Sequence, residues 1–269
     1  MRNPDCDDRQ DIRRQYQTQH NLNVRIRTHE FYGVPQIDFA AWVLDHVSWH
    51  GHERVIDVGC GSGMYTEPTR ARAAHYLAGD LSLGMLQKLE QPGLARVNLD
   101  AQAIPLADNT ADLILANHML YHVPDQEKAL CEFVRVLRPA GRLLAATNSA
   151  QNMEQFRALS RQALTLLGAG RQQESSTATF TLENGRDLLQ RHFRNVERYD
   201  LPGALIFPDP EPVIAYLGSS RERFEKALPA GRSWEDVVAV LEQILSTHIA
   251  GHGDFRVNKL TGVFVCDNQ

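Results

Sequence analysis

Short apolar runs alternate with amphipathic stretches along the middle of the chain, from position 54 to about position 147. The apolar runs read RVIDV, HYLAGD, ARVNLD, ADLILAN and GRLLAAT, and amphipathic segments such as SLGMLQKLE and DQEKALCEFVRVL lie among them. Strands that are buried on both faces are apolar throughout, whereas half-exposed strands alternate. The pattern therefore predicts an α/β fold, a doubly wound and mainly parallel sheet with helices on both faces.

The regions before and after this part carry a different pattern. Apolar residues at helical spacing predict helices over 36–47, 152–168, 182–193, 211–228 and 234–250. Residues 196–207 read as a strand, and residues 255–266 read as two β-like halves around Thr261. We expect seven strands in all with an antiparallel hairpin at the end, and a small helical lid formed by segments 150–192 and 208–252.

Length and composition fit a single globular domain, 1–269, that carries an insertion. The chain has 269 residues, of which 43% are hydrophobic and 23% are charged, and its formal net charge is -5. Nucleic-acid binders are usually basic, so no nucleic-acid partner is expected. No apolar run approaches the roughly 20 residues of a membrane helix, and no membrane span is expected. The polar first 20 residues do not resemble a signal peptide, and the four cysteines form no CxxC pair; both favour the cytoplasm.

The most informative stretch is a glycine loop, DVGCGSG, over residues 57–63. Glycines let the chain turn tightly and let a ligand approach the backbone without a Cβ in the way. In parallel α/β folds, ligands bind at such a loop, at the carboxyl end of the strand. A dinucleotide fingerprint needs GxGxxG, but its third glycine position is occupied by Met64 counting from Gly59, and by Thr66 counting from Gly61. A nucleotide-binding oxidoreductase is therefore disfavoured.

Acidic residues occur near the ends of the first three expected strands. Asp57 stands two residues before the first glycine, Asp80 closes HYLAGD and Asp100 closes ARVNLD. A carboxylate at the end of the second strand can accept hydrogen bonds from two ribose hydroxyls. Each acid alone could cap a helix, but the three together at one sheet edge favour a nucleoside site.

The stretches VIDVGCGSG, AGDLSLGML and NLDAQAIPLADNTADLILANHMLYHVPDQEKALCEFVRVLRPAGRLLAAT resemble the class I S-adenosylmethionine-dependent methyltransferases. The branch most similar includes the ubiquinone and menaquinone C-methyltransferases and many small-molecule enzymes. The resemblance covers about residues 50–148, and implies a Rossmann-like methyltransferase fold. Ala140 stands where the family usually has the first glycine of a proline–glycine–glycine turn, a departure that affects only a connection.

The resemblance implies a set of residues that bind S-adenosylmethionine and its product S-adenosylhomocysteine. The loop residues would surround the methionine tail and sugar, and Asp57 would order the loop and help to hold the cofactor's amino group. Asp80 would take the ribose hydroxyls, Leu81 and Met85 would pack near the adenine, and the Asp100 carboxylate and Ala101 N–H would meet its edge. Asn117 and His118 would lie close to the sulfonium. The implied set is Asp57, Gly59, Cys60, Gly61, Ser62, Gly63, Asp80, Leu81, Met85, Asp100, Ala101, Asn117 and His118.

Two histidines are candidates for a general base, which methyl transfer needs only where the accepting atom carries a tightly held proton. His118 and His122 flank Met119-Leu120-Tyr121 just after the fourth expected strand. Histidine titrates near neutral pH, so either could accept a proton. The family often has a histidine at the position of His122, where it can simply shape the loop, and we favour that structural role for His122.

An N-terminal segment, 1–35, is expected to cover the cofactor, as in related enzymes. Arg27, His29 and Tyr32 are its candidate cofactor or substrate contacts, and Arg27 could bind a carboxylate through two hydrogen bonds. The alternative is an ordinary amphipathic helix with solvated arginines.

Other chemistries fit less well. The remaining histidines lack the cysteine or carboxylate partners that would complete a tetrahedral metal site, so no metal is expected. The motif N/D-P-P-Y/F, which would indicate methylation of amines in bases or glutamine, does not occur after the fourth strand. The sequence thus predicts methyl transfer to the oxygen, nitrogen or carbon of a small-molecule acceptor. The alternative is a non-catalytic module that binds the cofactor or its product and acts through a partner. The acceptor and the oligomeric state are not predicted.

Overall fold

The computed structural model describes residues 19–170 and 179–268. Residues 1–18 of the expected N-terminal cover, 1–35, lie outside these ranges. The chain divides into two compact units. The first, the sheet unit, falls within residues 37–150, 177–201 and 261–269, and the second, the helical unit, falls within residues 1–36, 151–176 and 202–260.

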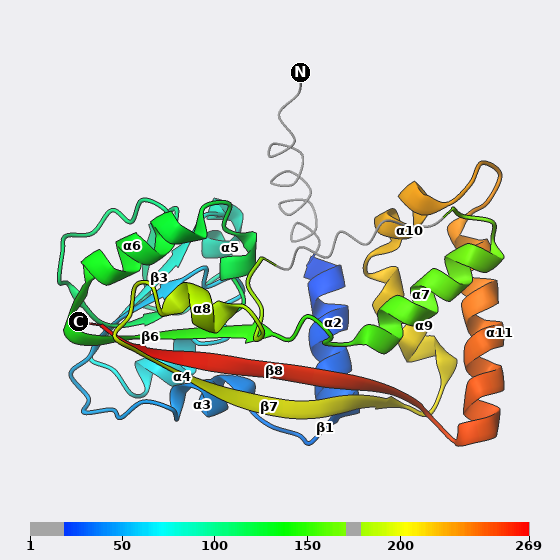
Figure 1. Ribbon diagram of the computed structural model, residues 1–269, viewed down its shortest axis with the longest axis horizontal. Coiled ribbons are helices and arrows are strands. Elements are labelled where there is room, and N and C mark those ends of the chain that lie inside the picture. Colours follow the sequence, from blue (N-terminus) through cyan, green and yellow to red (C-terminus); the bar gives the residue numbers. More distant parts are fainter. Residues whose placement is uncertain (1–18, 171–178, 269) are drawn as a thin grey trace. The chain divides into compact units, whose positions relative to one another are not determined.

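One sheet has the strand order β1-β7-β8-β6-β5-β2-β3-β4 (Figure 1). Its members are β1 (Gly33–Val34), β2 (Arg54–Val58), β3 (His75–Asp80), β4 (Ala95–Asn98), β5 (Ala111–Leu115), β6 (Leu137–Asn148), β7 (Asn195–Phe207) and β8 (Phe255–Asp267). Strands β2 to β6 pair in parallel, and β8 pairs antiparallel with β6. The predicted α/β class and mainly parallel sheet are confirmed. Within the part of the chain that the structure describes, the sheet has eight strands where seven were predicted, and one of them is the two-residue β1, which pairs with β7.

The predicted hairpin within 255–266 is wrong, because β8 is one continuous strand. Its pairing with β6 runs without interruption from Arg142↔Asp267 to Asn148↔Thr261 and passes through Gly262. A Cβ on Gly262 would lie 2.5 Å from the backbone oxygen of Tyr199. The glycine at this position therefore permits close approach of a neighbouring backbone, and does not mark a turn.

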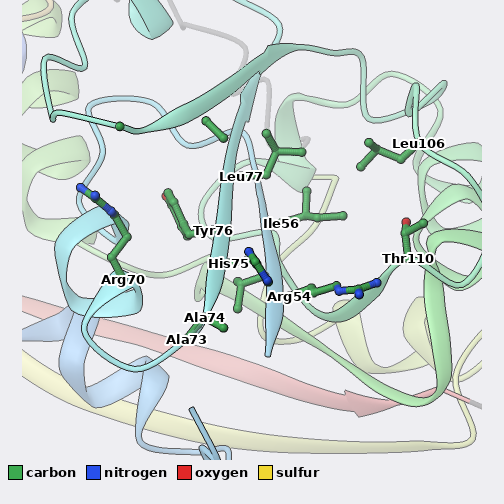
Figure 2. Close-up of a pocket in the computed structure, with 13 residues that line it drawn as sticks. Arg54, Ile56, Arg70, Ala73, Ala74, His75, Tyr76, Leu77, Leu106 and Thr110 are labelled. Carbon is green, nitrogen blue, oxygen red and sulfur yellow. The ribbon is translucent and has the colours of Figure 1, made fainter. Parts of the chain in front are cut away.

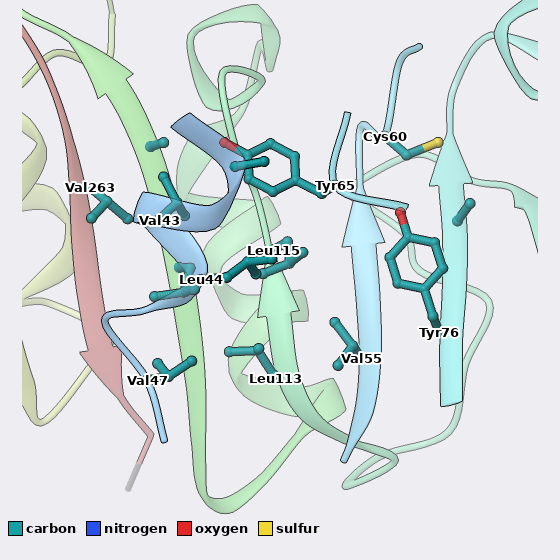
Figure 3. Packing of buried hydrophobic residues seen from close by; sticks show 14 of the residues in the cluster. Val43, Leu44, Val47, Val55, Cys60, Tyr65, Tyr76, Leu113, Leu115 and Val263 are labelled. Atoms are coloured by element: carbon teal, nitrogen blue, oxygen red, sulfur yellow. The ribbon is translucent and has the colours of Figure 1, made fainter. Parts of the chain in front are cut away.

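Helices cover both faces of the sheet unit, with α6 and α8 on the side opposite α3 and α4 in Figure 1. Its helices are α3 (Phe39–Leu44), α4 (Thr66–Arg70), α5 (Leu83–Gln87), α6 (Gln126–Val136) and α8 (Gly185–Leu189), with a 3₁₀ turn at Leu120–His122. Buried apolar residues of α3, β2, β5 and β6 form one core; Figure 3 shows Val43, Leu44, Val55 and Leu113 among them. The helix predicted over 182–193 is shorter than expected, since only Gly185–Leu189 is helical.

The helical unit has its own apolar core. It contains α2 (Gln19–Tyr32), α7 (Glu154–Leu166), α9 (Pro210–Gly218), α10 (Arg221–Ala227) and α11 (Trp234–His252). Phe156, Phe207, Val213 and Leu241 are among the buried residues of this core. The predicted helices over 152–168 and 234–250 are confirmed, and the one over 211–228 is divided into α9 and α10. Within the ranges described, no helix combines the length and apolar character that crossing a membrane requires.

Candidate functional site

The glycine loop connects β2 to α4 and is fixed to the end of β3. The N–H groups of Gly59 and Cys60 both donate to the carbonyl oxygen of Gly79, at 2.8 and 3.0 Å. Gly59, Gly61 and Gly63 have φ angles of 75°, 53° and 81°. Residues with side chains rarely adopt these angles, so the loop needs glycine for its shape.

The three glycines differ in what surrounds them. A Cβ on Gly59 would lie 2.7 Å from Met119 Cβ, and one on Gly63 would lie 2.7 Å from Leu89 Cδ2. These two glycines are therefore required by packing within the protein. A Cβ on Gly61 would meet no atom closer than 3.9 Å, the distance to Met85 Cε. A Cβ on Gly61 would therefore make only ordinary van der Waals contacts, so packing within the protein does not require glycine at this position.

Asp80, the last residue of β3, connects the loop to the adjoining strand. Its Oδ2 accepts from the Gly61 N–H at 2.9 Å, and its Oδ1 accepts from the Ser82 N–H at 2.8 Å. A carboxylate has about four acceptor positions, and these two bonds use only two of them. Asp80 is partly exposed, so its remaining positions fit the two neighbouring hydroxyls of a ribose.

Leu81 and Met85 follow Asp80 at the start of α5. Leu81 is 50% exposed, which is unusual for a leucine beside a buried strand, whereas Met85 is buried and lies nearest to Gly61. The exposed Leu81 side chain and the Met85 side chain near Gly61 are both apolar, so they are suited to contact with an aromatic ring. Ser62 of the loop is exposed, and Cys60 is buried.

Asp57 lies in the core below the loop, since only 1% of it is exposed. Its Oδ2 accepts a hydrogen bond from the Tyr76 hydroxyl at 2.6 Å, and that hydroxyl lies 3.2 Å from Thr66 Oγ1. Burial raises the pKa of Asp57 to about 7, the bond from Tyr76 opposes this, and the charge of Asp80 adds to it. Asp57 thus supports the loop from inside, and its contact with a cofactor amino group stays a prediction.

The segment after β4 brings Asp100 and Ala101 to the same edge. The Leu99 N–H donates to the Asp80 carbonyl oxygen at 3.1 Å. Asp100 Oδ1 accepts from both the backbone N–H and the side-chain Nε2 of Gln102, each at 2.9 Å. Ala101 is buried. The Gln102 amide thus orients the Asp100 carboxylate, and no motif in the sequence singled out this residue.

Asn117 and His118 follow β5. Asn117 is buried, its Oδ1 accepts from the Ala146 N–H at 2.9 Å, and its Nδ2 has no hydrogen-bond partner in the described part of the chain. The His118 N–H donates to the Ala146 carbonyl oxygen at 2.8 Å, and its φ is 55°. The His118 ring lies 5.4 Å from that of Phe39. A buried amide donor without a partner is a group that a ligand oxygen could satisfy.

His122 ends the 3₁₀ turn Leu120–His122, and its N–H donates to the Met119 carbonyl oxygen. Burial lowers the pKa of His122 below its usual value. At neutral pH the imidazole is therefore mainly uncharged, the form that can accept a proton. The structure agrees with either a loop-shaping role or a base.

The three candidates of the N-terminal segment lie on α2, in the helical unit. Arg27 is exposed. Lys259 Nζ donates to His29 Nδ1 at 2.9 Å, and the ring of Tyr32 lies 4.9 Å from that of Phe207. Tyr32 thus packs against the core of its own unit, and the role of these residues as cofactor cover stays a prediction.

A hollow in the sheet unit lies away from the glycine loop. It measures about 590 Å³, and its lining includes the first residues of β2, β3 and β4, which are Arg54, His75 and Ala95. Figure 2 shows Arg54 and His75 in this hollow. It therefore opens at the amino ends of the parallel strands, opposite the glycine loop. Among the described residues, no group of three or more histidine, cysteine or acidic side chains is arranged to hold a metal ion.

The parallel sheet with a glycine loop after β2 and an acid at the end of β3 is typical of Rossmann-like folds, in which nucleotides bind at this edge of the sheet. Residues 56–145 match the family model described as "Methyltransferase domain". These residues contain the glycine loop, Asp80, Asp100 and both candidate histidines. The match agrees with the resemblance found in the sequence over the same part of the chain.

Two relatives and one solved structure show how far the likeness extends. A demethylmenaquinone methyltransferase of Renibacterium salmoninarum is 37% identical over 117 residues, 43% of this chain and 49% of that protein. A malonyl-[acyl-carrier protein] O-methyltransferase of Serratia marcescens is 32% identical over 123 residues, 45% and 48% of the two chains. The chain thus spans about half the length of these relatives. The YcgJ protein of Bacillus subtilis, 14% identical with a TM-score of 0.55 over 86% of this chain and 98% of its own, shares the fold.

Proposed function

We propose that the protein transfers a methyl group from S-adenosylmethionine to a small-molecule acceptor. The observation that carries the proposal is the pairing of the Gly61 N–H with the Asp80 carboxylate at 2.9 Å, where both residues are partly exposed. This pairing puts an acceptor for ribose hydroxyls next to a loop that a nucleoside can approach closely. The match of residues 56–145 to a methyltransferase domain supports the same cofactor.

In the proposed complex the chain's own residues bind and align. Asp80 would accept from the ribose hydroxyls, the Gly61 backbone would lie against the methionine portion, and Leu81 and Met85 would lie beside the base. Asn117 Nδ2 would donate to a ligand oxygen. The cofactor supplies a methyl group on a positively charged sulfur, which an electron-rich acceptor atom displaces in line. Alignment of the reacting atoms and exclusion of water lower the barrier without a residue that forms a bond.

The acceptor is left open because the relatives point to different chemistries. One is named for a quinone precursor and the other for a protein-bound malonyl group. A carbon acceptor and a carboxylate oxygen place different demands on a base: the first must lose a proton and the second need not. The unpaired thiols Cys60, Cys131 and Cys266 fit a reducing compartment, for which we propose the cytoplasm.

Calorimetry with S-adenosylhomocysteine tests the cofactor, and a parallel titration with NADH tests the disfavoured oxidoreductase. Binding of the first and not of the second supports the proposal. Release of S-adenosylhomocysteine from S-adenosylmethionine in the presence of fractionated metabolite extracts then tests turnover. Binding without release in any fraction would favour the alternative, a non-catalytic module that binds the cofactor and acts through a partner.

A further inference from the structure

A cysteine, a histidine and a glutamate form a chain of contacts on the surface of the sheet unit, away from the glycine loop. Cys131 and Glu127 lie four residues apart on α6, and His192 follows α8. Cys131 Sγ is 3.9 Å from His192 Nδ1, and His192 Nε2 forms a short hydrogen bond with Glu127 Oε2. Arg191 Nη1 donates to the other oxygen of Glu127, Oε1, at 2.8 Å.

The contacts define which ring nitrogen carries the proton. The bonds from His192 and Arg191 lower the pKa of Glu127, so its carboxylate is charged at neutral pH and can only accept. His192 Nε2 therefore donates to Glu127 Oε2. In the tautomer with its proton on Nε2 alone, Nδ1 is an acceptor. Nδ1 is the nitrogen that faces Cys131 Sγ. A nucleophile next to a base, with the base oriented by a third group, is the arrangement that activates thiols and hydroxyls.

The surroundings of the three described thiols differ. Cys60 and Cys266 are buried, and burial raises the pKa of both thiols, which makes them unreactive. Cys131 is exposed, whereas the side chain of its neighbour His192 is only 13% exposed. The imidazole is thus held in place by Glu127 and by the protein around it, and the sulfur is open to a small molecule in solution.

We propose that Cys131 is a nucleophilic thiol that undergoes exchange with low-molecular-weight disulfides, with His192 as its base and Glu127 as the residue that orients His192. Nδ1 of His192 takes the proton from Sγ, and the thiolate attacks one sulfur of the disulfide. The bond between the two sulfurs of the small molecule breaks, and a mixed disulfide forms on Cys131. The departing thiolate takes the proton back from His192, so the reaction needs no other oxidant or reductant.

The test uses the full chain with Cys6→Ser, because Cys6 lies outside the described residues. Dithiodipyridine serves as the small disulfide, release of its thiopyridone gives the rate, and peptide mass spectrometry gives the site. We expect Cys131 to react first, and His192→Gln to slow it about tenfold at pH 7, where an ordinary thiol is only a few per cent ionised. Glu127→Gln should slow the reaction to a smaller extent. Near pH 10 ordinary thiols are ionised, and the rates should converge.

The matched control is His50→Gln. His50 Nδ1 lies 3.1 Å from Glu53 Oε1, so the two form a second histidine–glutamate pair. Among the described residues, no cysteine is hydrogen-bonded to His50. This control should leave the rate at Cys131 unchanged. Equal rates at pH 7 for the Cys6→Ser protein and for the same protein with His192→Gln would overturn the proposal. A tenfold difference in rate that persists at pH 10 would also overturn it, because it would indicate a change in access to the sulfur and not in ionisation of the thiol. Circular dichroism verifies that each variant is folded. If His192→Gln does not fold, the rate at Cys131 in Glu127→Gln is the test of the proposal. Because the cofactor takes no part, the result is independent of the proposed methyl transfer.

Discussion

The Tyr76 hydroxyl donates a 2.6 Å hydrogen bond to the Asp57 carboxylate, joining β3 to β2 directly below the glycine loop. Asp57 is almost fully buried, and this hydrogen bond offsets part of the free energy that removing its carboxyl group from water costs. The pair therefore links the stability of the sheet to the shape of the loop.

Removal of this hydroxyl should destabilise the protein. We expect Tyr76→Phe to lower the free energy of unfolding by about 1–3 kcal/mol, the usual cost of leaving a buried polar group unsatisfied. Urea denaturation measures the change. Tyr65→Phe is the matched control, because the Tyr65 hydroxyl is also buried but has no hydrogen-bond partner among the described residues. Equal losses in the two variants would show that the Asp57 bond contributes nothing.

The raised pKa of Asp57 predicts a pH dependence of stability. The folded state holds this proton up to about pH 7, whereas an unfolded aspartate loses it near 3.8. The stabilisation is therefore complete below the unfolded value and is lost as pH rises towards 7. Asp57→Asn cannot ionise, so between pH 5 and pH 8 it should gain about 1–3 kcal/mol of unfolding free energy relative to the wild type. Urea curves at both pH values measure this, and an unchanged difference would contradict it.

A methyl group at Gly61 should interfere with ligand binding more than with folding. Gly61→Ala and Gly93→Ala both introduce a side chain at positive φ, 53° and 69°, and neither Cβ would clash. Each should cost about 1–2 kcal/mol of stability from backbone strain. Only Gly61→Ala should also weaken binding of S-adenosylhomocysteine, by about tenfold or more, a loss of at least about 1.4 kcal/mol. Calorimetry of both variants distinguishes strain from lost access.

Asp80 should contribute to cofactor affinity through its charge. We expect Asp80→Ala to weaken binding by about 1.5–3 kcal/mol, the range for hydrogen bonds to a charged group. Asp80→Asn keeps an oxygen that can accept from the Gly61 N–H, and so separates loop order from ribose binding. If both variants bind S-adenosylhomocysteine as tightly as the wild type, Asp80 has no part in binding the sugar.

Asparagine substitutions test the two histidines. Asparagine tolerates positive φ, so His118→Asn removes the imidazole and retains the backbone conformation at 55°. With an acceptor in hand, we expect His118→Asn to lower turnover at saturating cofactor by about 10²-fold, as for loss of a general base. His122→Asn should lower it less than tenfold, in keeping with a loop-shaping role. Full turnover in both variants would mean that neither histidine is a base and that alignment alone supports the reaction.

The sequence was sufficient to predict the elements with strong local signals. The apolar runs from β2 to β6 indicate buried parallel strands. The glycines at 59, 61 and 63 indicate a tight turn of the backbone. The acid at position 80 could be placed because it closes one of these runs.

The features that the sequence did not reveal depend on pairing between distant segments. Asp57 was expected to order the loop and to help hold the cofactor, and the pairing of β2 with β3 adds a partner in the core, Tyr76, that the sequence did not indicate. The hairpin predicted around Thr261 failed because Gly262 marks the close approach of another strand. His192 contacts Cys131 and Glu127, which only the tertiary structure brings near it.

The N–H groups of Gly59 and Cys60 donate hydrogen bonds to the Gly79 carbonyl oxygen, so main-chain atoms hold this part of the glycine loop in place. Outward-facing positions such as Ser62 and Met64, both exposed, take no part in that scaffold. A randomised library at these two positions should therefore yield mostly folded proteins, and selection on such a library could diversify the molecules that the loop accommodates without redesign of the sheet.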